Sequence, residues 1–122
     1  MSIIISDENT NISFFKEEIK EFVLKRGWTK YHTPKNLIQA LQIEIAELSE
    51  IFLFKDFQLD QIIKDKKLLS NISDEIADVF IYLISLINVF NIDLTEIYQN
   101  KMEKNRFKYP VDEFNNGIYY KK

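Results

Sequence analysis

The stretch DEIADVFIYLISLI, residues 74–87, is apolar at almost every position, yet Asp78 stands in the middle of it. The apolar segment spans about 15 residues, fewer than the roughly 20 that a helix needs to cross a bilayer, so we expect a buried core helix. A buried carboxylate costs several kcal/mol unless it is neutralised, paired or bound to a metal. No Lys or Arg lies between Leu68 and Phe90, so the partner of Asp78 must come from another segment.

The scarcity of glycine and proline favours helices. Two of each in 122 residues leave little punctuation for the turns of a β-rich fold. A chain of this length fits one domain, which we expect to cover residues 1–122. We expect its helical core at about residues 11–110 and an extended, aromatic C-terminal tail at residues 111–122.

Net charge and cysteine content limit the kinds of binding partner and the cellular compartment that we expect. A net charge of -3 argues against a nucleic acid polymer or an acidic lipid surface as the partner. Cysteine is absent, which excludes disulfides and thiolate metal sites. The start, MSIIISDENT, lacks the basic region and the long apolar run of a signal peptide. The sequence therefore predicts a cytoplasmic protein without a membrane segment.

Apolar periodicity and capping residues predict four helices with short connections, which favours a four-helix bundle of the all-α class. Asn11, Thr33 and Asp93 are good N-caps, and Thr33 is followed by proline, a favoured first helical residue. The polar segment KDFQLDQIIKDKK is either a short helix or a connecting loop. The expected helices cover about residues 11–26, 33–54, a span from the caps Ser70, Asn71 and Ser73 to Phe90, and 94–107.

Two pairs of acidic residues have the spacing that places both carboxylates on one helix face. Glu44 and Glu47 lie within and at the edge of the apolar face of the second helix, and Glu75 and Asp78 repeat the spacing on the third. Tyr82 follows one turn after Asp78 on the same strip. Each acid alone is explained by an ion pair with another segment or by a wet groove. Taken together, the two pairs predict a cluster of four carboxylates between two helices.

Such a cluster favours a hard cation. Carboxylate oxygens without nitrogen or sulfur ligands suit Mg²⁺, with Mn²⁺ as a second possibility. A di-iron site in a helical bundle would instead use a Glu-x-x-His motif on two helices, and this chain has one histidine, His32. Mg²⁺ bound by carboxylates keeps positions for water and substrate phosphates, so phosphoryl or nucleotidyl chemistry is expected.

Cations and aromatic rings that suit a nucleotide occur elsewhere in the chain. Lys101, Asn105 and Lys108 share a face at the end of the last helix, and Lys104 and Arg106 lie beside them. They are equally well explained as a solvated helix end, where cations are favoured by the helix dipole. The aromatic candidates offer stacking faces for a base but also serve as packing for the bundle; they are Trp28, Tyr31, His32 and Phe54.

With these motifs in this order, the sequence resembles the MazG-like, all-α nucleoside triphosphate pyrophosphohydrolases. The shared signature is E-x-x-E followed by E-x-x-D, and the resemblance extends in order over about residues 14–110. Within the family the chain looks closest to the dCTP pyrophosphatase branch, in which a W-x-x-[FY]-H-x-P-x-N-L loop precedes the acidic helix. The segments that carry it are RGWTKYHTPKNL, EIAELSEIFLFK, DEIADVFIYL and KMEKNRFKYP.

The resemblance implies the roles of individual residues. Four acids would bind Mg²⁺: Glu44, Glu47, Glu75 and Asp78. Lys101, Asn105 and Arg106 would approach the triphosphate, while Trp28 and His32 would lie near the base. Tyr82 joins these as a candidate substrate contact, and so does Phe54, which stands where this branch tends to have a tryptophan. The resemblance also implies a homo-oligomer, usually a tetramer built as a pair of dimers with sites completed by a neighbouring chain.

The expected reaction is hydrolysis between the α and β phosphates of a (deoxy)nucleoside triphosphate such as dCTP, with Glu47 orienting the attacking water. Two other functions stay open. One keeps the fold and changes the substrate, as in a dUTPase-like hydrolase. The other is a noncatalytic helical module, a binding or antitoxin-like bundle, in which the carboxylates form an interhelical charge network.

Overall fold

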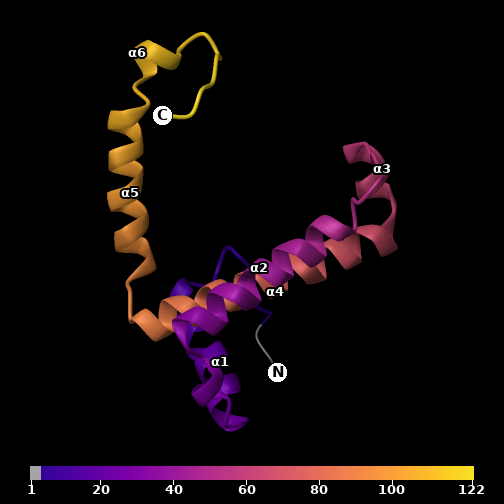
Figure 1. Cartoon of the computed structure of the whole chain (residues 1–122), viewed down its shortest axis with the longest axis vertical. Coiled ribbons are helices and arrows are strands. Elements are labelled where there is room, and N and C mark those ends of the chain that lie inside the picture. The colour runs from indigo at the N-terminus through magenta and orange to yellow at the C-terminus, as the bar shows by residue number, and fades with distance from the viewer. Residues whose placement is uncertain (1–3) are drawn as a thin grey trace. The chain divides into compact units, whose positions relative to one another are not determined.

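A computed structural model describes residues 4–122, and over these residues the chain is helical without any β-strand (Figure 1). The all-α class is therefore confirmed. The elements in chain order are α1 (Ile12–Lys25), the 3-10 helix η1 (Thr29–Tyr31), α2 (Pro34–Glu50), α3 (Leu59–Lys64), α4 (Lys66–Phe90), α5 (Leu94–Lys108) and α6 (Val111–Phe114).

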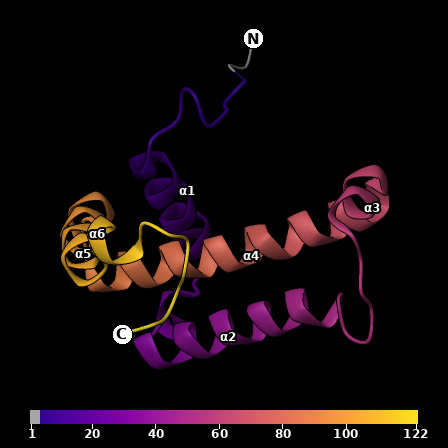
Figure 2. The same ribbon diagram turned by 90° about the horizontal axis from the view of Figure 1, so that it is seen from above.

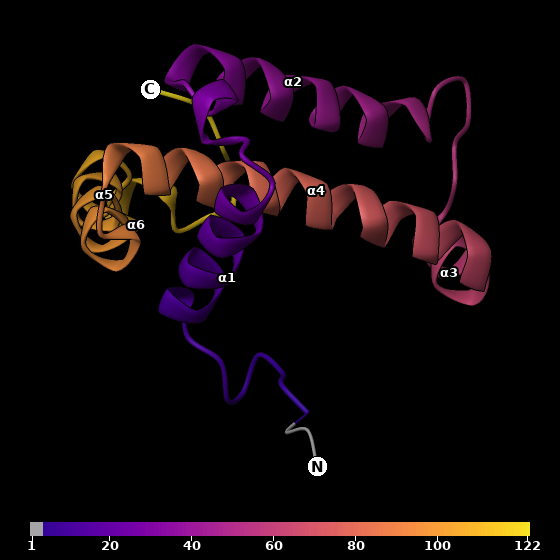
Figure 3. The same ribbon diagram turned by 90° about the horizontal axis from the view of Figure 1, so that it is seen from below.

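The chain divides into two compact units, one that extends to Asn91 and one that runs from Ile92 to Lys122. In the first unit α2 and α4 lie side by side and run antiparallel, with α3 preceding α4 and α1 packed across α4 (Figures 2 and 3). The second unit consists of α5, α6 and the C-terminal segment. The sequence predicts that four helices form one bundle. Three of the long helices, α1, α2 and α4, belong to the first unit, so the four-helix bundle stays a prediction.

Few apolar side chains of the described residues are fully enclosed. The buried ones are Leu37 on α2 and Ile72, Ile84 and Ile87 on α4, so the core follows the contact of α2 with α4. Asn88 connects α4 to α1 by donating a side-chain hydrogen bond to the Lys16 carbonyl at 3.1 Å. Phe15 on α1 meets Phe80 on α4 edge to face, with ring centroids 5.1 Å apart. These contacts fix α1 against α4.

The caps at Asn11, Thr33 and Asp93 are confirmed. Each side-chain oxygen accepts a hydrogen bond from a backbone N–H in the first turn of its helix. Gly27 follows α1 with φ +67°, a conformation that glycine adopts without steric cost. The first helix therefore begins and ends close to where the sequence predicts.

Two predicted helix ends are wrong. The α4 helix begins at Lys66 because Asp65 caps it and accepts a hydrogen bond from Leu68 N–H, so Ser70, Asn71 and Ser73 lie inside the helix. Ser73 satisfies its hydroxyl there by donating to the Leu69 carbonyl at 2.7 Å. The second wrong boundary is the C-terminal end of α2. This helix ends at Glu50 instead of continuing to Phe54, and Phe54 lies in the turn that follows with φ 57°.

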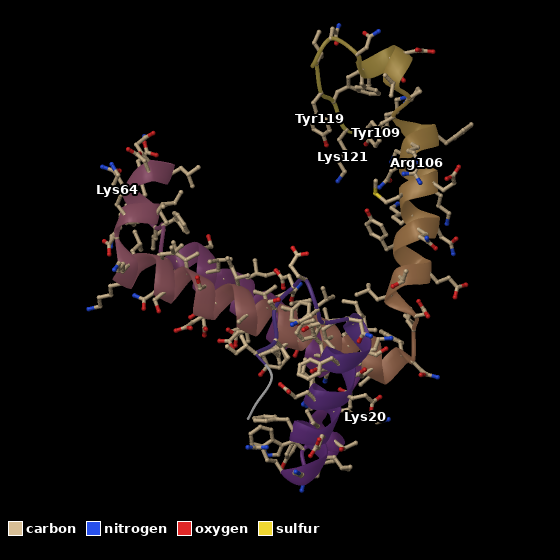
Figure 4. All side chains as sticks on the ribbon, turned by 180° about the vertical axis from the view of Figure 1, so that it is seen from behind. Lys20, Lys64, Arg106, Tyr109, Tyr119 and Lys121 are labelled. Atoms are coloured by element: carbon tan, nitrogen blue, oxygen red, sulfur yellow. The ribbon has the colours of Figure 1, made fainter. Side chains whose placement is uncertain are left out.

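The second unit closes on itself through its aromatic residues. The rings of Tyr109 and Tyr119 stack with centroids 6.4 Å apart, and Figure 4 shows the two side chains together. Lys122 N–H donates to the Tyr109 hydroxyl at 2.9 Å, and its Nζ pairs with Glu113 at 2.6 Å. The tail thus packs through its aromatics as expected, although it contains the short helix α6 and is not extended throughout.

Within residues 4–122, no individual helix has both the length and the apolar character required to cross a bilayer. Joined across the break that separates them, α4 and α5 meet the same criterion by length and composition.

The Asp65 cap gives a prediction for stability. Replacing Asp65 with Ala leaves the Leu68 N–H without its acceptor and should lower the free energy of unfolding by about 1 kcal/mol. Urea denaturation followed by circular dichroism measures this change. Asp56→Ala, in the loop before α3, is the matched control and should change stability much less. Equal losses in both variants would contradict the capping role.

Candidate functional site

Three carboxylates from two helices meet at one point in the first unit. Glu44 on α2 and Glu75 and Asp78 on α4 each offer an oxygen, and these oxygens lie within 4.8 Å of one another. All three side chains are half-buried. The structure therefore brings together one member of the first predicted acidic pair and both members of the second.

The local sequence explains this convergence. Residues three apart on a helix share a face, so Glu75 and Asp78 point in similar directions from α4. Leu37 and Ile72 are buried on the same two helices, which holds α2 against α4 and turns Glu44 inward. Glu47 lies one turn further along α2 and is exposed, but its carboxylate is close enough to act electrostatically on both Glu44 and Glu75. The fourth predicted acid thus lies at the rim of the cluster.

No ion pair among the described residues neutralises the cluster. The salt bridges found in residues 4–122 join Lys25 to Glu21, Arg106 to Glu103 and Lys122 to Glu113, all outside it. Oε2 of Glu44 and Oε2 of Glu75 are both buried without a hydrogen-bond partner. Buried polar atoms are normally satisfied, so these two oxygens identify a place where a ligand is expected.

The electrostatics of the cluster are consistent with a bound cation. Burial, followed by the neighbouring Glu47 and Asp78 carboxylates, raises the pKa of Glu44 from 4.5 to about 7. Burial, followed by the charge of Glu47, also raises the pKa of Glu75. In both residues the charged form is disfavoured because like charges share a partly desolvated space. A divalent cation bound by these oxygens would reverse that effect.

The donor set fits Mg²⁺ or Mn²⁺. Hard divalent cations prefer carboxylate oxygens and keep some water ligands, and the described cluster supplies carboxylates only. The two buried oxygens without partners are consistent with direct ligands. Glu44, Glu75 and Asp78 would hold the ion, and Glu47 would reach it from the rim.

A cavity of about 510 Å³ opens beside the carboxylates. Glu44 and Asp78 form part of its wall, so a molecule in the cavity lies next to the cluster. Trp28, His32 and Tyr82 also line it, which places three of the predicted substrate contacts around one space. Burial lowers the pKa of His32, which favours the neutral ring; a neutral imidazole has one hydrogen-bond donor and one acceptor.

Aromatic and acidic residues that the sequence did not single out complete the cavity wall. Phe15 and Phe22 come from α1, where helical periodicity assigns them to the core; the ring of Phe22 meets Trp28 edge to face at 6.0 Å. Ser85 is 3% exposed and donates its hydroxyl to the Ile81 carbonyl. Glu18 lies on the wall as well. No motif distinguishes these residues, because periodicity describes a cavity wall and a packed face alike.

Four of the predicted site residues lie away from the cavity or in the other unit. Phe54 is 98% exposed and does not line the cavity, so its stacking role stays a prediction. Lys101, Asn105 and Arg106 are on α5 in the second unit, where Figure 4 shows Arg106 on the helix. Arg106 pairs with Glu103 at 3.3 Å on the same helix. The approach of these three residues to a triphosphate stays a prediction.

Comparison with known proteins gives consistent results. The family model described as the MazG-like family matches residues 39–121. The chain is 37% identical over 92 residues to dCTP pyrophosphatase 1 of Mus musculus and 35% identical to that of Homo sapiens, and each match covers 75% of this chain. The chain spans about half of these relatives, since the match covers 54% of their length.

One solved structure is similar to this chain over nearly the whole length of the solved protein. The crystal structure of a pyrophosphatase from Archaeoglobus fulgidus superposes with a TM-score of 0.74 and 39% sequence identity. The superposition covers 88% of this chain and 99% of the archaeal chain. The helical arrangement is therefore shared with a protein that is solved independently.

The raised pKa of Glu44 predicts how the metal-free protein responds to pH. Between about pH 5 and about pH 7 the folded chain binds more protons than the unfolded chain, so stability should fall as pH rises through this range. The melting temperature, followed by circular dichroism in the presence of a chelator, measures the slope. Glu44→Gln removes the titrating group and should flatten it. An unchanged slope in that variant would show that another group is responsible.

Proposed function

The chain belongs to the MazG-like family, and from this premise we propose that it is a Mg²⁺-dependent nucleoside triphosphate pyrophosphohydrolase. Water would attack the α phosphorus of a (deoxy)nucleoside triphosphate, the bond from the α phosphorus to the bridging oxygen would break, and the products would be the monophosphate and pyrophosphate. The proposal rests on one observation above all: Glu44 and Asp78 belong both to the carboxylate cluster and to the wall of the aromatic cavity.

We propose that the substrate divides between two regions of the site. The polyphosphate would lie at the carboxylates, where Glu44, Glu75 and Asp78 would hold a Mg²⁺ that would supply charge neutralisation and an activated water. The base and sugar belong in the cavity, because Trp28 and Phe22 present ring faces and edges and His32 offers hydrogen bonds. Ligand sites of this kind are concave and largely apolar with a few polar groups, and the cavity of about 510 Å³ has that character.

In the proposed reaction water is the nucleophile that attacks the α phosphorus, so no side chain becomes covalently attached to the substrate. Glu44, Glu75 and Asp78 hold charge in a fixed, half-buried geometry. Glu47 is exposed at the rim beside Glu44 and Glu75, which suits it to accept a hydrogen bond from the attacking water and orient it. Lys101, Asn105 and Arg106 are proposed to stabilise the leaving pyrophosphate.

We propose dCTP, or a closely similar nucleotide, as the substrate because relatives at 35% and 37% identity are named dCTP pyrophosphatase 1. The alternative on the same fold is a dUTPase-like preference. Cytosine and uracil differ in the hydrogen-bonding pattern of one edge, and a site that leaves a polar group unpaired rejects the wrong base strongly. The tetrameric assembly and the cytoplasmic location expected from the sequence stay predictions.

The products distinguish this reaction from other phosphoryl chemistry. Incubation with each common and 5-modified (d)NTP plus Mg²⁺, followed by chromatography of the products, should give monophosphate and pyrophosphate, fastest with a cytosine nucleotide. Diphosphate and orthophosphate would contradict the proposed bond cleavage. A preference for dUTP would keep the reaction and replace the substrate.

Removal of one central carboxylate tests the metal site. Asp78→Asn should lower turnover by on the order of 100-fold or more, because an amide replaces a charged ligand without changing the shape of α4. Steady-state rates and circular dichroism together measure the loss and the intact fold. Asp60→Asn on α3, outside the cluster, is the control.

A thermal-shift measurement separates the enzyme from a noncatalytic module. Mg²⁺ with a nonhydrolysable nucleotide should raise the melting temperature of the unchanged protein, because both ligands bind the folded chain. Asp78→Asn should lose most of that shift. No shift in either protein, together with full activity of Asp78→Asn, would exclude the metal assignment.

A further inference from the structure

An acid lies in the face that α1 turns toward the cavity of about 510 Å³. The cavity-lining residues of α1 have the spacing of one helix face; they are Phe15, Glu18, Ile19, Phe22 and Val23. Glu18 is the member of this set that is not apolar. The salt bridges found in residues 4–122 do not involve its carboxylate. An ionised carboxylate only accepts hydrogen bonds, so Glu18 presents the cavity with an acceptor.

Ser85 presents a second acceptor, for a different reason. Its side chain is 3% exposed, and its hydroxyl donates to the Ile81 carbonyl at 2.9 Å. A hydroxyl has one proton and two lone pairs. Because the proton is already used within α4, Ser85 can only accept a hydrogen bond from a molecule in the cavity, whose wall it forms.

The contact between α1 and α4 brings the two acceptors into the same region. The Asn88 side chain donates to the Lys16 carbonyl at 3.1 Å, which joins the two helices at this point. Ser85 precedes Asn88 by three residues on α4, and Glu18 follows Lys16 by two residues on α1. Each acceptor therefore lies within about one helical turn of the contact.

This region is separate from the carboxylate cluster but belongs to the same cavity. Ser85 follows Asp78 by seven residues, which is nearly two full turns, so both residues lie on one face of α4. The distance between them along the helix axis is about 10 Å at 1.5 Å per residue. A nucleotide whose α phosphate lies at Asp78 would therefore have its base at the Ser85 end of the cavity.

We propose that Glu18 and Ser85 are specificity-determining residues that accept the two hydrogen bonds of the 4-amino group of a cytosine base. This inference rests on the proposed function for the placement of the nucleotide, and it deepens that function by assigning the choice of base to two side chains. The cytosine amine carries two N–H donors, which match the two acceptors. Uracil has a carbonyl oxygen at the same position, so acceptors would face an acceptor and stay unpaired, which disfavours that base.

The other polar groups of the wall suit the remaining edge of cytosine. The ring nitrogen N3 and the 2-carbonyl of cytosine are both acceptors. Trp28 and His32 line the cavity, and each ring carries an N–H donor. Donors from these two rings and acceptors from Glu18 and Ser85 together form the hydrogen-bonding complement of cytosine.

The ratio of kcat/KM for dCTP to that for dUTP tests Glu18. The unchanged protein should prefer dCTP. Glu18→Gln should lower the ratio by roughly 10-fold or more, because the amide replaces a charged acceptor and can also donate to the uracil carbonyl. Glu17→Gln is the matched control; Glu17 is exposed on the same helix, outside the cavity wall, and its variant should keep the ratio of the unchanged protein.

Ser85 has a matched control on its own helix. Ser73 also donates its hydroxyl to a carbonyl four residues earlier, at 2.7 Å, but it lies outside the cavity wall. Ser85→Ala should lower the dCTP-to-dUTP ratio by roughly threefold or more, whereas Ser73→Ala should leave it unchanged. Circular dichroism checks that each variant is folded. Equal losses of kcat/KM for the two nucleotides in Glu18→Gln and Ser85→Ala, or an unchanged protein without a preference, would overturn the inference.

A binding measurement distinguishes failure of this inference from failure of the proposed function. Trp28 is the only tryptophan of the chain and lines the cavity, so its fluorescence reports titrations with dCMP and dUMP without any hydrolysis. Tighter binding of dCMP that Glu18→Gln and Ser85→Ala both weaken, in a protein that hydrolyses no triphosphate, would retain the base recognition and remove the enzymatic function. Hydrolysis to monophosphate and pyrophosphate with the same base preference in all four variants would do the reverse.

Discussion

The packing of α2 against α4 is the interaction on which the rest of this structure depends. It buries Leu37 and Ile72 and at the same time brings Glu44 to Glu75 and Asp78. Apolar burial drives the contact, while three acids that crowd within 4.8 Å oppose it, as the raised pKa of Glu44 shows. A helix pair that keeps such an unfavourable cluster at its centre has its charges arranged for a cation, and the family relationship agrees with that interpretation.

The sequence predicts the carboxylates and most of the helices because short-range geometry determines both. Spacing by three residues places Glu75 and Asp78 on one face, and a polar residue before an apolar repeat marks a helix start, as at Asn11 and Thr33. The start of α4 could not be predicted in this way, since several polar residues in the preceding segment are possible N-caps. Asp65 caps that helix, while Ser73 accommodates itself inside it by donating to a carbonyl one turn earlier. Local sequence offers both solutions, and packing against α2 and α3 selects between them.

The cavity could not be predicted from periodicity for a related reason. An apolar residue at helical spacing is assigned to the core whether it packs against a neighbour, as Ile84 does, or lines a cavity, as Phe22 does. The same holds for Ile45 and Ile76, which have core-like spacing but are about half exposed. A hydrophobic pattern therefore predicts that a helix face is buried, but it does not show whether a ligand, the same chain or another copy buries it.

The two sides of the α2–α4 pair are linked by the backbone itself. Glu44 and Ile45 are consecutive, as are Glu75 and Ile76, so a displacement of either helix that moves these exposed isoleucines also moves a carboxylate of the cluster. The helices are rigid on this scale because each residue is fixed by backbone hydrogen bonds, and side chains one residue apart cannot shift independently. A cation bound by these carboxylates would lower the repulsion among them and would thereby favour the packing of α2 against α4.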